Sequence, residues 1–265
     1  MADRVTHLAI CWRVERRDGV AIGLTDHDRD LEVDGMTYRA APGMTPSAIV
    51  RGDGLDPATM EAKGALSSAA ITERDLLAGR WDGARVAIFA LDRVEGAQVA
   101  LGEGTIGAVD VGDHGFSAEL RGAAAALDRP ATEATSPDCR AELGDRRCRV
   151  AMAGRRRFAR VVAADGERVT LDRVEPSADA YGGGLARWLG GANSGFESAV
   201  TASAGASVTL RALPPFAVES GALIEVIEGC DKTIATCAGR FGNAANFRGE
   251  PYLPGIDLLT RYPGG

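Results

Sequence analysis

The stretch GCDKTIATCAGRFGNAANFRGEPYLPG, residues 229–255, differs in composition from the rest of the chain. It contains Cys230 and Cys237, separated by six residues, and after Cys237 it is rich in glycine, asparagine and proline. Proline has no backbone donor, and glycine and asparagine favour turns, so this composition predicts an irregular C-terminal segment. A segment without ladder hydrogen bonds needs another source of order, and the two thiols can provide it.

Two cysteines upstream complete a set of four. Cys139 and Cys148 are separated by eight residues, and 81 residues lie between Cys148 and Cys230. The intervening residues are expected to fold as strands, so that closure of this β-structure brings two cysteine-bearing loops together. The fifth cysteine, Cys11, lies in an apolar segment and is interpreted as a small core residue.

The four cysteines allow three interpretations. Four free thiols would be unusual in polar loops. A structural zinc ion is the second interpretation, although paired zinc ligands are usually only about two to four residues apart. The third is an iron–sulfur cluster, which is larger than one ion and suits wider spacings. All three histidines lie in the first half of the chain, which argues against a mixed cysteine–histidine site.

Residues 139–160 are strongly basic. They contain eight arginines against two acidic residues, Glu142 and Asp145, which leaves a net charge of +6. The arginines are Arg140, Arg146, Arg147, Arg149, Arg155, Arg156, Arg157 and Arg160. Positive charge near a thiol lowers its pKa and offsets the charge of a thiolate-bound metal. The alternative is a solvated basic face or a docking surface for a partner.

Period-two alternation and turn signals predict β-structure in both halves of the chain. Strands are expected over 5–14, 20–24, 59–64, 84–94, a pair within 100–122, 158–163, 168–174, 200–203, 207–212 and 222–228. Short helices are expected over 71–79, capped by Thr72, and over 123–127. Residues 181–184 are expected to form a loop and residues 187–191 a close approach of the backbone. The chain is therefore expected to be mainly β, with two β-rich domains of barrel or sandwich type and an irregular, stapled C-terminal segment.

Asp26, Asp28 and Asp30 have the spacing of a calcium loop. Such a loop needs glycine at its sixth position and glutamate at its twelfth, where this chain has Leu31 and Thr37. We therefore predict a solvated turn between strands.

A polar connector with proline near both ends, residues 129–137, predicts a boundary between domains 1–130 and 131–265. Residues 1–130 hold 14 basic and 21 acidic side chains, a net charge of −7, whereas residues 131–265 hold 16 of each. This acidic half disfavours specific nucleic-acid binding. The sequence has no apolar run long enough to span a membrane, and the N-terminus shows no export signal. Folding in a reducing bacterial cytoplasm is therefore expected, where disulfides are rare.

The cysteine set and the run that ends Asn246-Phe247-Arg248-Gly249…Pro254-Gly255 resemble the baseplate hub proteins of gene transfer agents and related prophages. These proteins are distantly similar to the lambda-type minor tail protein L. The resemblance extends more weakly to residues 6–9, 25–28, 104–127 and 188–193.

This resemblance implies a structural protein at the tip of a phage-like tail. No enzymatic activity is expected, because the sequence shows no nucleophile–base constellation. It implies a homotrimer that forms a ring around the tail channel, links the distal tail protein to the central tail-tip or fibre protein, and takes part in DNA delivery. The tape-measure protein is a further expected partner. The resemblance also implies a [4Fe–4S] cluster, with zinc as the alternative, on Cys139, Cys148, Cys230 and Cys237. Such a cluster would staple the C-terminal segment.

Three further functions compete with this one. A tail-tip enzyme acting on the cell wall would need a cysteine and a histidine within hydrogen-bond reach. His7 and Cys11 stand four residues apart on a predicted strand, about 13 Å by strand rise, which is too far. A zinc-stapled structural protein is the second competing function. A redox electron carrier is the third, and no motif favours it.

Overall fold

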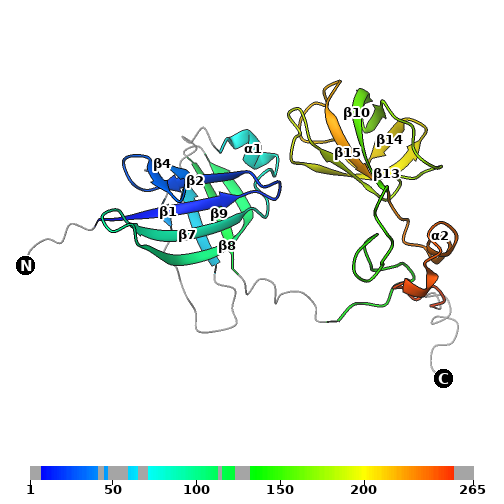
Figure 1. Ribbon diagram of the computed structural model, residues 1–265, viewed down its shortest axis with the longest axis horizontal. Coiled ribbons are helices and arrows are strands. Elements are labelled where there is room, and N and C mark those ends of the chain that lie inside the picture. Colours follow the sequence, from blue (N-terminus) through cyan, green and yellow to red (C-terminus); the bar gives the residue numbers. More distant parts are fainter. Residues whose placement is uncertain are drawn as a thin grey trace, which may run out of the picture. The chain divides into compact units, whose positions relative to one another are not determined.

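The structure is a computed structural model that describes residues 7–40, 45–46, 59–64, 71–112, 115–122 and 132–253. The chain divides into two compact units, Met1–Ala131 and Thr132–Gly265. Both are built mainly of strands (Figure 1), which confirms the expected mainly β fold with short helices. The helix expected over 123–127 lies outside the described residues. Within those residues, no helix has the length and apolarity needed to cross a membrane.

The first unit contains a sheet in the order β3-β4-β2-β1-β7-β8-β9-β6-β5. Its strands are β1 (Leu8–Glu15), β2 (Ala21–Thr25), β3 (Leu31–Val33), β4 (Met36–Ala40), β5 (Thr45–Pro46), β6 (Thr59–Gly64), β7 (Arg85–Asp92), β8 (Gln98–Gly112) and β9 (Gly115–Arg121). Helix α1 (Glu73–Leu77) begins at Thr72, whose side chain accepts a hydrogen bond from the backbone N–H of Asp75, as the sequence predicts. The core of the first unit includes the buried residues Trp12, Trp81 and Leu24.

The acidic turn after β2 uses its aspartates to bind backbone. Asp26 accepts a hydrogen bond from the backbone N–H of Ile10 at 2.8 Å, and Asp30 accepts one from Ala40 at 2.8 Å. These carboxylates therefore stabilise the junction between neighbouring strands, and the prediction of a turn in place of a calcium loop fits this arrangement.

The second unit contains a closed barrel in the order β10-β11-β14-β13-β12-β15. Its strands are β10 (Arg156–Asp165), β11 (Arg168–Leu171), β12 (Leu185–Trp188), β13 (Glu197–Ala204), β14 (Ser207–Leu210) and β15 (Leu223–Ile227). Alternate side chains of these strands, including Val161, Trp188, Val200 and Ile224, fill the interior.

The sequence-based prediction misses one strand of this barrel. It expects only a close approach of the backbone at residues 187–191, but β12 pairs there with both β13 and β15. Glycines crowd both ends of this strand and leave it only four residues long, so it carries little alternation. Trp188 anchors it, because the Trp188 indole donates a hydrogen bond to Ser198 Oγ at 2.9 Å inside the barrel.

The C-terminal segment is also more regular than expected. It contains a short helix α2 (Ile234–Gly239) and a 3-10 turn η2 (Ala244–Asn246). Thr233 caps α2, since its side chain accepts the backbone N–H of Thr236 at 3.2 Å. The rest of the described segment is irregular, as the sequence predicts, and α2 is missed because most of the glycine and asparagine follows the capped turn.

Candidate functional site

The barrel brings the two pairs of cysteines together. Strands β10 and β15 are antiparallel neighbours, with Arg156 opposite Ile227. The chain therefore enters and leaves the barrel side by side, and residues 132–155 and 228–253 meet beyond that end of the barrel (Figure 1). Closure of the intervening strands joins the two loops, as the sequence predicts.

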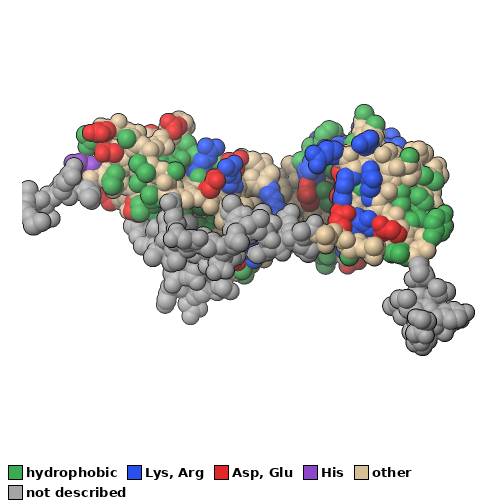
Figure 2. All heavy atoms as spheres, turned by 90° about the horizontal axis from the view of Figure 1, so that it is seen from below, with side chains coloured by type: hydrophobic (Ala, Val, Ile, Leu, Met, Phe, Trp, Pro, Cys, Tyr) green, Lys and Arg blue, Asp and Glu red, His purple; other side chains and the backbone are tan. Residues whose placement is uncertain are grey.

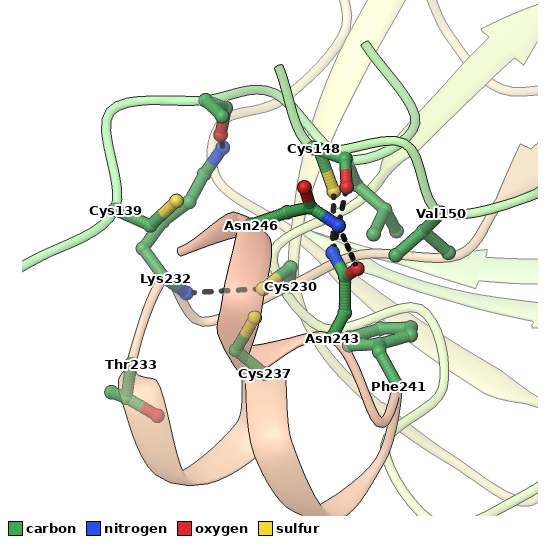
Figure 3. A pocket seen from close by; sticks show the side chains of 12 residues that line it. Cys139, Cys148, Val150, Cys230, Lys232, Thr233, Cys237, Phe241, Asn243 and Asn246 are labelled. Atoms are coloured by element: carbon green, nitrogen blue, oxygen red, sulfur yellow. Dashed lines mark hydrogen bonds between the residues drawn. The ribbon is translucent and has the colours of Figure 1, made fainter. Parts of the chain in front are cut away.

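One cavity is lined by all four cysteines of the predicted ligand set, Cys139, Cys148, Cys230 and Cys237 (Figure 3). Cys148 and Cys237 are buried, with Cys237 on helix α2, whereas Cys139 and Cys230 are half-buried. All of these thiols are free. The fifth cysteine, Cys11, is fully buried in the first unit, in agreement with its interpretation as a core residue.

Backbone hydrogen bonds hold the two cysteine-bearing segments against each other. The N–H of Cys139 donates to the carbonyl of Lys232 at 2.8 Å, and the N–H of Arg140 donates to the carbonyl of Arg248 at 3.0 Å. On the other loop, Asp145 accepts the backbone N–H of Cys148 at 2.6 Å, which fixes the turn that presents this cysteine. Hydrogen bonds of the chain itself therefore frame the cavity, without a ligand.

Three N–H groups point at cysteine sulfur atoms. The backbone N–H of Lys232 lies 3.4 Å from Cys230 Sγ, and that of Arg248 lies 3.3 Å from Cys139 Sγ. The side-chain amide of Asn243 lies 3.8 Å from Cys148 Sγ. Donors in such positions stabilise a thiolate and are the usual outer contacts of cysteine ligands to metal.

Burial and neighbouring thiols raise the pKa of two of the cysteines, Cys237 and Cys230. Burial is the largest cause that raises the pKa of Cys237, and the nearby Cys139, Cys230 and Cys148 add to it. Burial likewise raises the pKa of Cys230, while the N–H of Lys232 opposes the effect. Four thiolates in this cavity therefore need a compensating positive charge, which a bound metal would supply.

The rest of the cavity suits a ligand held by sulfur alone. Its described walls are largely apolar, with Ala141, Leu143, Val150 and Phe241 among them, and contain no histidine or carboxylate. Among the residues that the structure describes, no three His, Cys, Asp or Glu side chains are grouped so as to hold a metal ion. The cysteines thus surround a shared space without forming a one-ion site in these rotamers. Four cysteines around one largely apolar space are the donor set that a thiolate-bound cluster would use.

The arginine-rich stretch has two uses, since three of its arginines pair with carboxylates and three others, on β10, form an exposed basic face. Arg140 binds Glu250 through both of its terminal nitrogens, at 2.6 and 2.8 Å, Arg147 binds Glu133, and Arg155 binds Glu228 at 2.6 Å. Arg140 and Arg155 therefore tie the two cysteine-bearing segments together through carboxylates, whereas Arg147 pairs within the first of them. Arg156, Arg157 and Arg160 on β10 are exposed, and Figure 2 shows Lys and Arg side chains gathered on one face of the second unit.

A further clamp joins the C-terminal segment to the end of the barrel. The ring of Phe241 lies under two guanidinium groups, 5.1 Å from Arg155 and 4.8 Å from Arg240. Both arginines also bind the buried carboxylate of Glu228, at 2.6 and 2.9 Å. This contact involves no cysteine, so it holds the segment independently of the thiols.

Sequence reasoning misses two residues of the site. Lys232 is one of only two lysines in the chain and is not among the predicted site residues, yet its ammonium group donates to the carbonyl of Ala141 at 2.7 Å and to Glu142 at 3.0 Å. Asn243 belongs to a turn-rich run, yet it contacts both cysteine-bearing loops. Their closeness in sequence to Cys230 and Cys237 is the one signal that points to them.

Comparison with known proteins agrees with this architecture. Residues 1–151 match a family described as baseplate hub protein, N-terminal attachment domain, and residues 179–257 match one described as phage conserved hypothetical protein BR0599. No curated protein matches the chain. A chain from a solved structure of the virion of a native gene transfer agent particle is 36% identical, with a TM-score of 0.85, over 99% of this chain and 93% of that one. The resemblance stated from the sequence is confirmed: this chain belongs to the phage baseplate hub protein family.

Proposed function

We propose that this chain is the structural hub at the tip of a phage-like tail, and that its four cysteines hold a metal cofactor that fixes the C-terminal segment. Membership of the baseplate hub family and the likeness to a chain of a gene transfer agent virion support the first part. The observation that carries the second part is that four cysteines from two distant segments line one cavity.

The chain's own residues prepare the site for the cofactor. A [4Fe–4S] cluster, or zinc as the alternative, would supply positive charge and metal–sulfur bonds to Cys139, Cys148, Cys230 and Cys237. The N–H groups of Lys232 and Arg248 hold Cys230 and Cys139 in place. Apolar walls limit access of water to the sulfur atoms.

A fixed C-terminal segment serves a hub because assembly then costs little ordering of the chain. In this proposal the hub is a homotrimer that forms a ring around the tail channel. It links the distal tail protein to the central tail-tip or fibre protein, contacts the tape-measure protein, and takes part in DNA delivery. Light scattering of the purified protein tests the trimer: three times the 27.6 kDa of one chain is expected. A monomer at all concentrations would contradict it.

The proposal includes no enzymatic activity. Cys11 has no exposed surface and burial raises the pKa of its thiol, which suits a structural residue better than a nucleophile. Incubation of the purified hub with murein, beside an active hydrolase, is expected to release no fragments above background. Release of fragments by the hub alone would instead favour a tail-tip enzyme.

The cofactor is tested by anaerobic purification followed by iron, sulfide and zinc analysis. About four irons and four sulfides per chain, lost in Cys230→Ser and kept in Cys11→Ala, are expected for the cluster. One zinc ion per chain without sulfide would mean that zinc, in place of the cluster, fixes the C-terminal segment. If protein kept reduced and anaerobic contains no metal, the proposed cofactor site is refuted. The proposed hub role would then still be tested separately, by the light-scattering measurement of the trimer.

A further inference from the structure

Asn243 is the residue through which the C-terminal segment reaches the opposite cysteine loop. Its side-chain nitrogen donates to the carbonyl of Cys148 at 2.7 Å and lies 3.8 Å from Cys148 Sγ. Its backbone N–H donates to the carbonyl of Cys237 at 2.9 Å. One residue thus contacts a cysteine on each of the two segments, and Figure 3 shows it beside Cys148 in the cavity.

The orientation of this amide is fixed by its partners. A carbonyl oxygen only accepts hydrogen bonds, so the nitrogen of the Asn243 amide must face Cys148. The other end of the amide, Oδ1, accepts a hydrogen bond from the side-chain nitrogen of Asn246 at 2.7 Å. Both ends of the amide are therefore occupied, and a rotation of the group would break both contacts.

Cys148 depends on this contact more than its counterparts do. The donors to Cys230 and Cys139 are backbone groups, which any residue at positions 232 and 248 other than proline would supply. The donor to Cys148 is a side chain, so the amino acid at position 243 decides whether it exists. Cys148 is also a buried member of the set, at 9% exposure.

We infer that Asn243 is the positioning residue of the cysteine site: its amide holds the Cys148 loop and aims an N–H at the Cys148 sulfur, which favours ligation and raises the reduction potential of an iron–sulfur cluster bound there. This inference rests on the proposed cofactor site. Hydrogen bonds to ligand sulfur stabilise the more negative, reduced state of a cluster. Outer-shell partners of metal ligands typically contribute about 10- to 100-fold to metal affinity.

The first experiment uses the metal-loaded full chain. Asn243→Asp keeps the shape of the side chain but replaces the donor with an anion, and Asn243→Gln keeps the amide. We expect Asn243→Asp to lose metal to a chelator about 10-fold faster or more than the parent. If the metal is a cluster, its midpoint potential should also fall. Asn243→Gln should lie between the two, and unchanged metal loss and potential in Asn243→Asp would overturn the inference.

A second readout needs no metal and separates this inference from the proposed cofactor. In metal-free, reduced protein, alkylation of each cysteine is followed by mass spectrometry. We expect Asn243→Ala to raise the alkylation rate of Cys148 several-fold, because release of its loop exposes a buried sulfur atom, and to leave that of Cys139 unchanged. Equal acceleration at all four cysteines would mean general unfolding of the segment and would overturn the inference. If the parent chain binds no metal, the proposed cofactor is refuted. The alkylation rates of Cys148 and Cys139 then decide by themselves whether Asn243 positions Cys148.

Discussion

Arg140 and Glu250, 110 residues apart in the chain, form a paired ion contact in which two guanidinium nitrogens donate to the two carboxylate oxygens at 2.6 and 2.8 Å. Glu250 also accepts the backbone N–H of Ser136 at 2.9 Å. The contact joins a residue near the start of the second unit to one near the end of its described residues. It therefore holds the two cysteine-bearing segments together beside the barrel.

The pH dependence of this contact follows from the pKa of Glu250. The bond from Arg140 is the largest cause that lowers this pKa, from an ordinary 4.5 to about 2. Because the folded pKa is below the unfolded one, the stabilisation is complete above about pH 4.5 and is lost as the pH falls toward 2. We expect the protection of amides near Ser136, measured against the intrinsic exchange rate at each pH, to decrease as the pH falls over this interval. In Glu250→Gln this part of the pH dependence should vanish, and an identical profile in both proteins would refute the assignment.

The clamp at Phe241 should hold the segment without metal. In Phe241→Ala, both guanidinium contacts to the ring are lost, at a cost of about 1 kcal/mol. We expect limited proteolysis of metal-free protein to cut near residue 240 several-fold faster than in the parent. Phe158→Ala, which removes an aromatic side chain that is 59% exposed on β10, is the matched control and should leave this rate unchanged. Equal rates in both variants would rule out the clamp.

If the proposed cofactor binds the four cysteines, its removal should loosen the C-terminal segment and spare the barrel. The barrel core is built from residues such as Val161, Trp188 and Ile224, and the cysteines lie outside it. With a chelator, we expect faster amide exchange in α2 and η2 and unchanged exchange in β13 and β14. Loss of protection throughout the barrel would show that the cofactor supports the whole unit.

The barrel itself should be sensitive at Trp188. This side chain is 1% exposed, and its indole is the hydrogen-bond partner of Ser198 Oγ. Trp188→Phe leaves Ser198 without that donor and leaves space unfilled, so we expect a loss of about 2–3 kcal/mol in the free energy of unfolding. Urea denaturation measures this loss. Leu189→Ala, at a side chain that is 40% exposed, should change the free energy of unfolding by less than about 0.5 kcal/mol.

Strands with alternating side chains and clear turns are predictable from the sequence. Thr72 and the Asp165-Gly166 turn mark a helix start and a hairpin, and the structure has both. Strand β12 is missed because four residues between glycines carry too little periodicity. Helix α2 is missed because the composition of the residues after it dominates the prediction.

The site is predictable only at the level of its thiols. Cysteines are rare, and their spacing is visible, so the set of four can be named from the sequence. The contact of Asn243 with Cys148 spans 95 residues and leaves no local pattern. The same holds for Arg155 and Glu228, whose pairing depends on the adjacency of β10 and β15. Such contacts follow from closure of the barrel, which no local sequence pattern specifies residue by residue.

The adjacency of β10 and β15 also sets an order of folding. In an unfolded chain, Cys148 and Cys230 are separated by 81 residues, and their encounter carries the entropy cost of closing that loop. Strand pairing and the buried core of the barrel offset this entropy cost. The closed barrel then holds both cysteine-bearing loops at the same end. The barrel must therefore close before the site exists. A nascent chain that has not yet completed β15 lacks the cavity in which the proposed cofactor would bind.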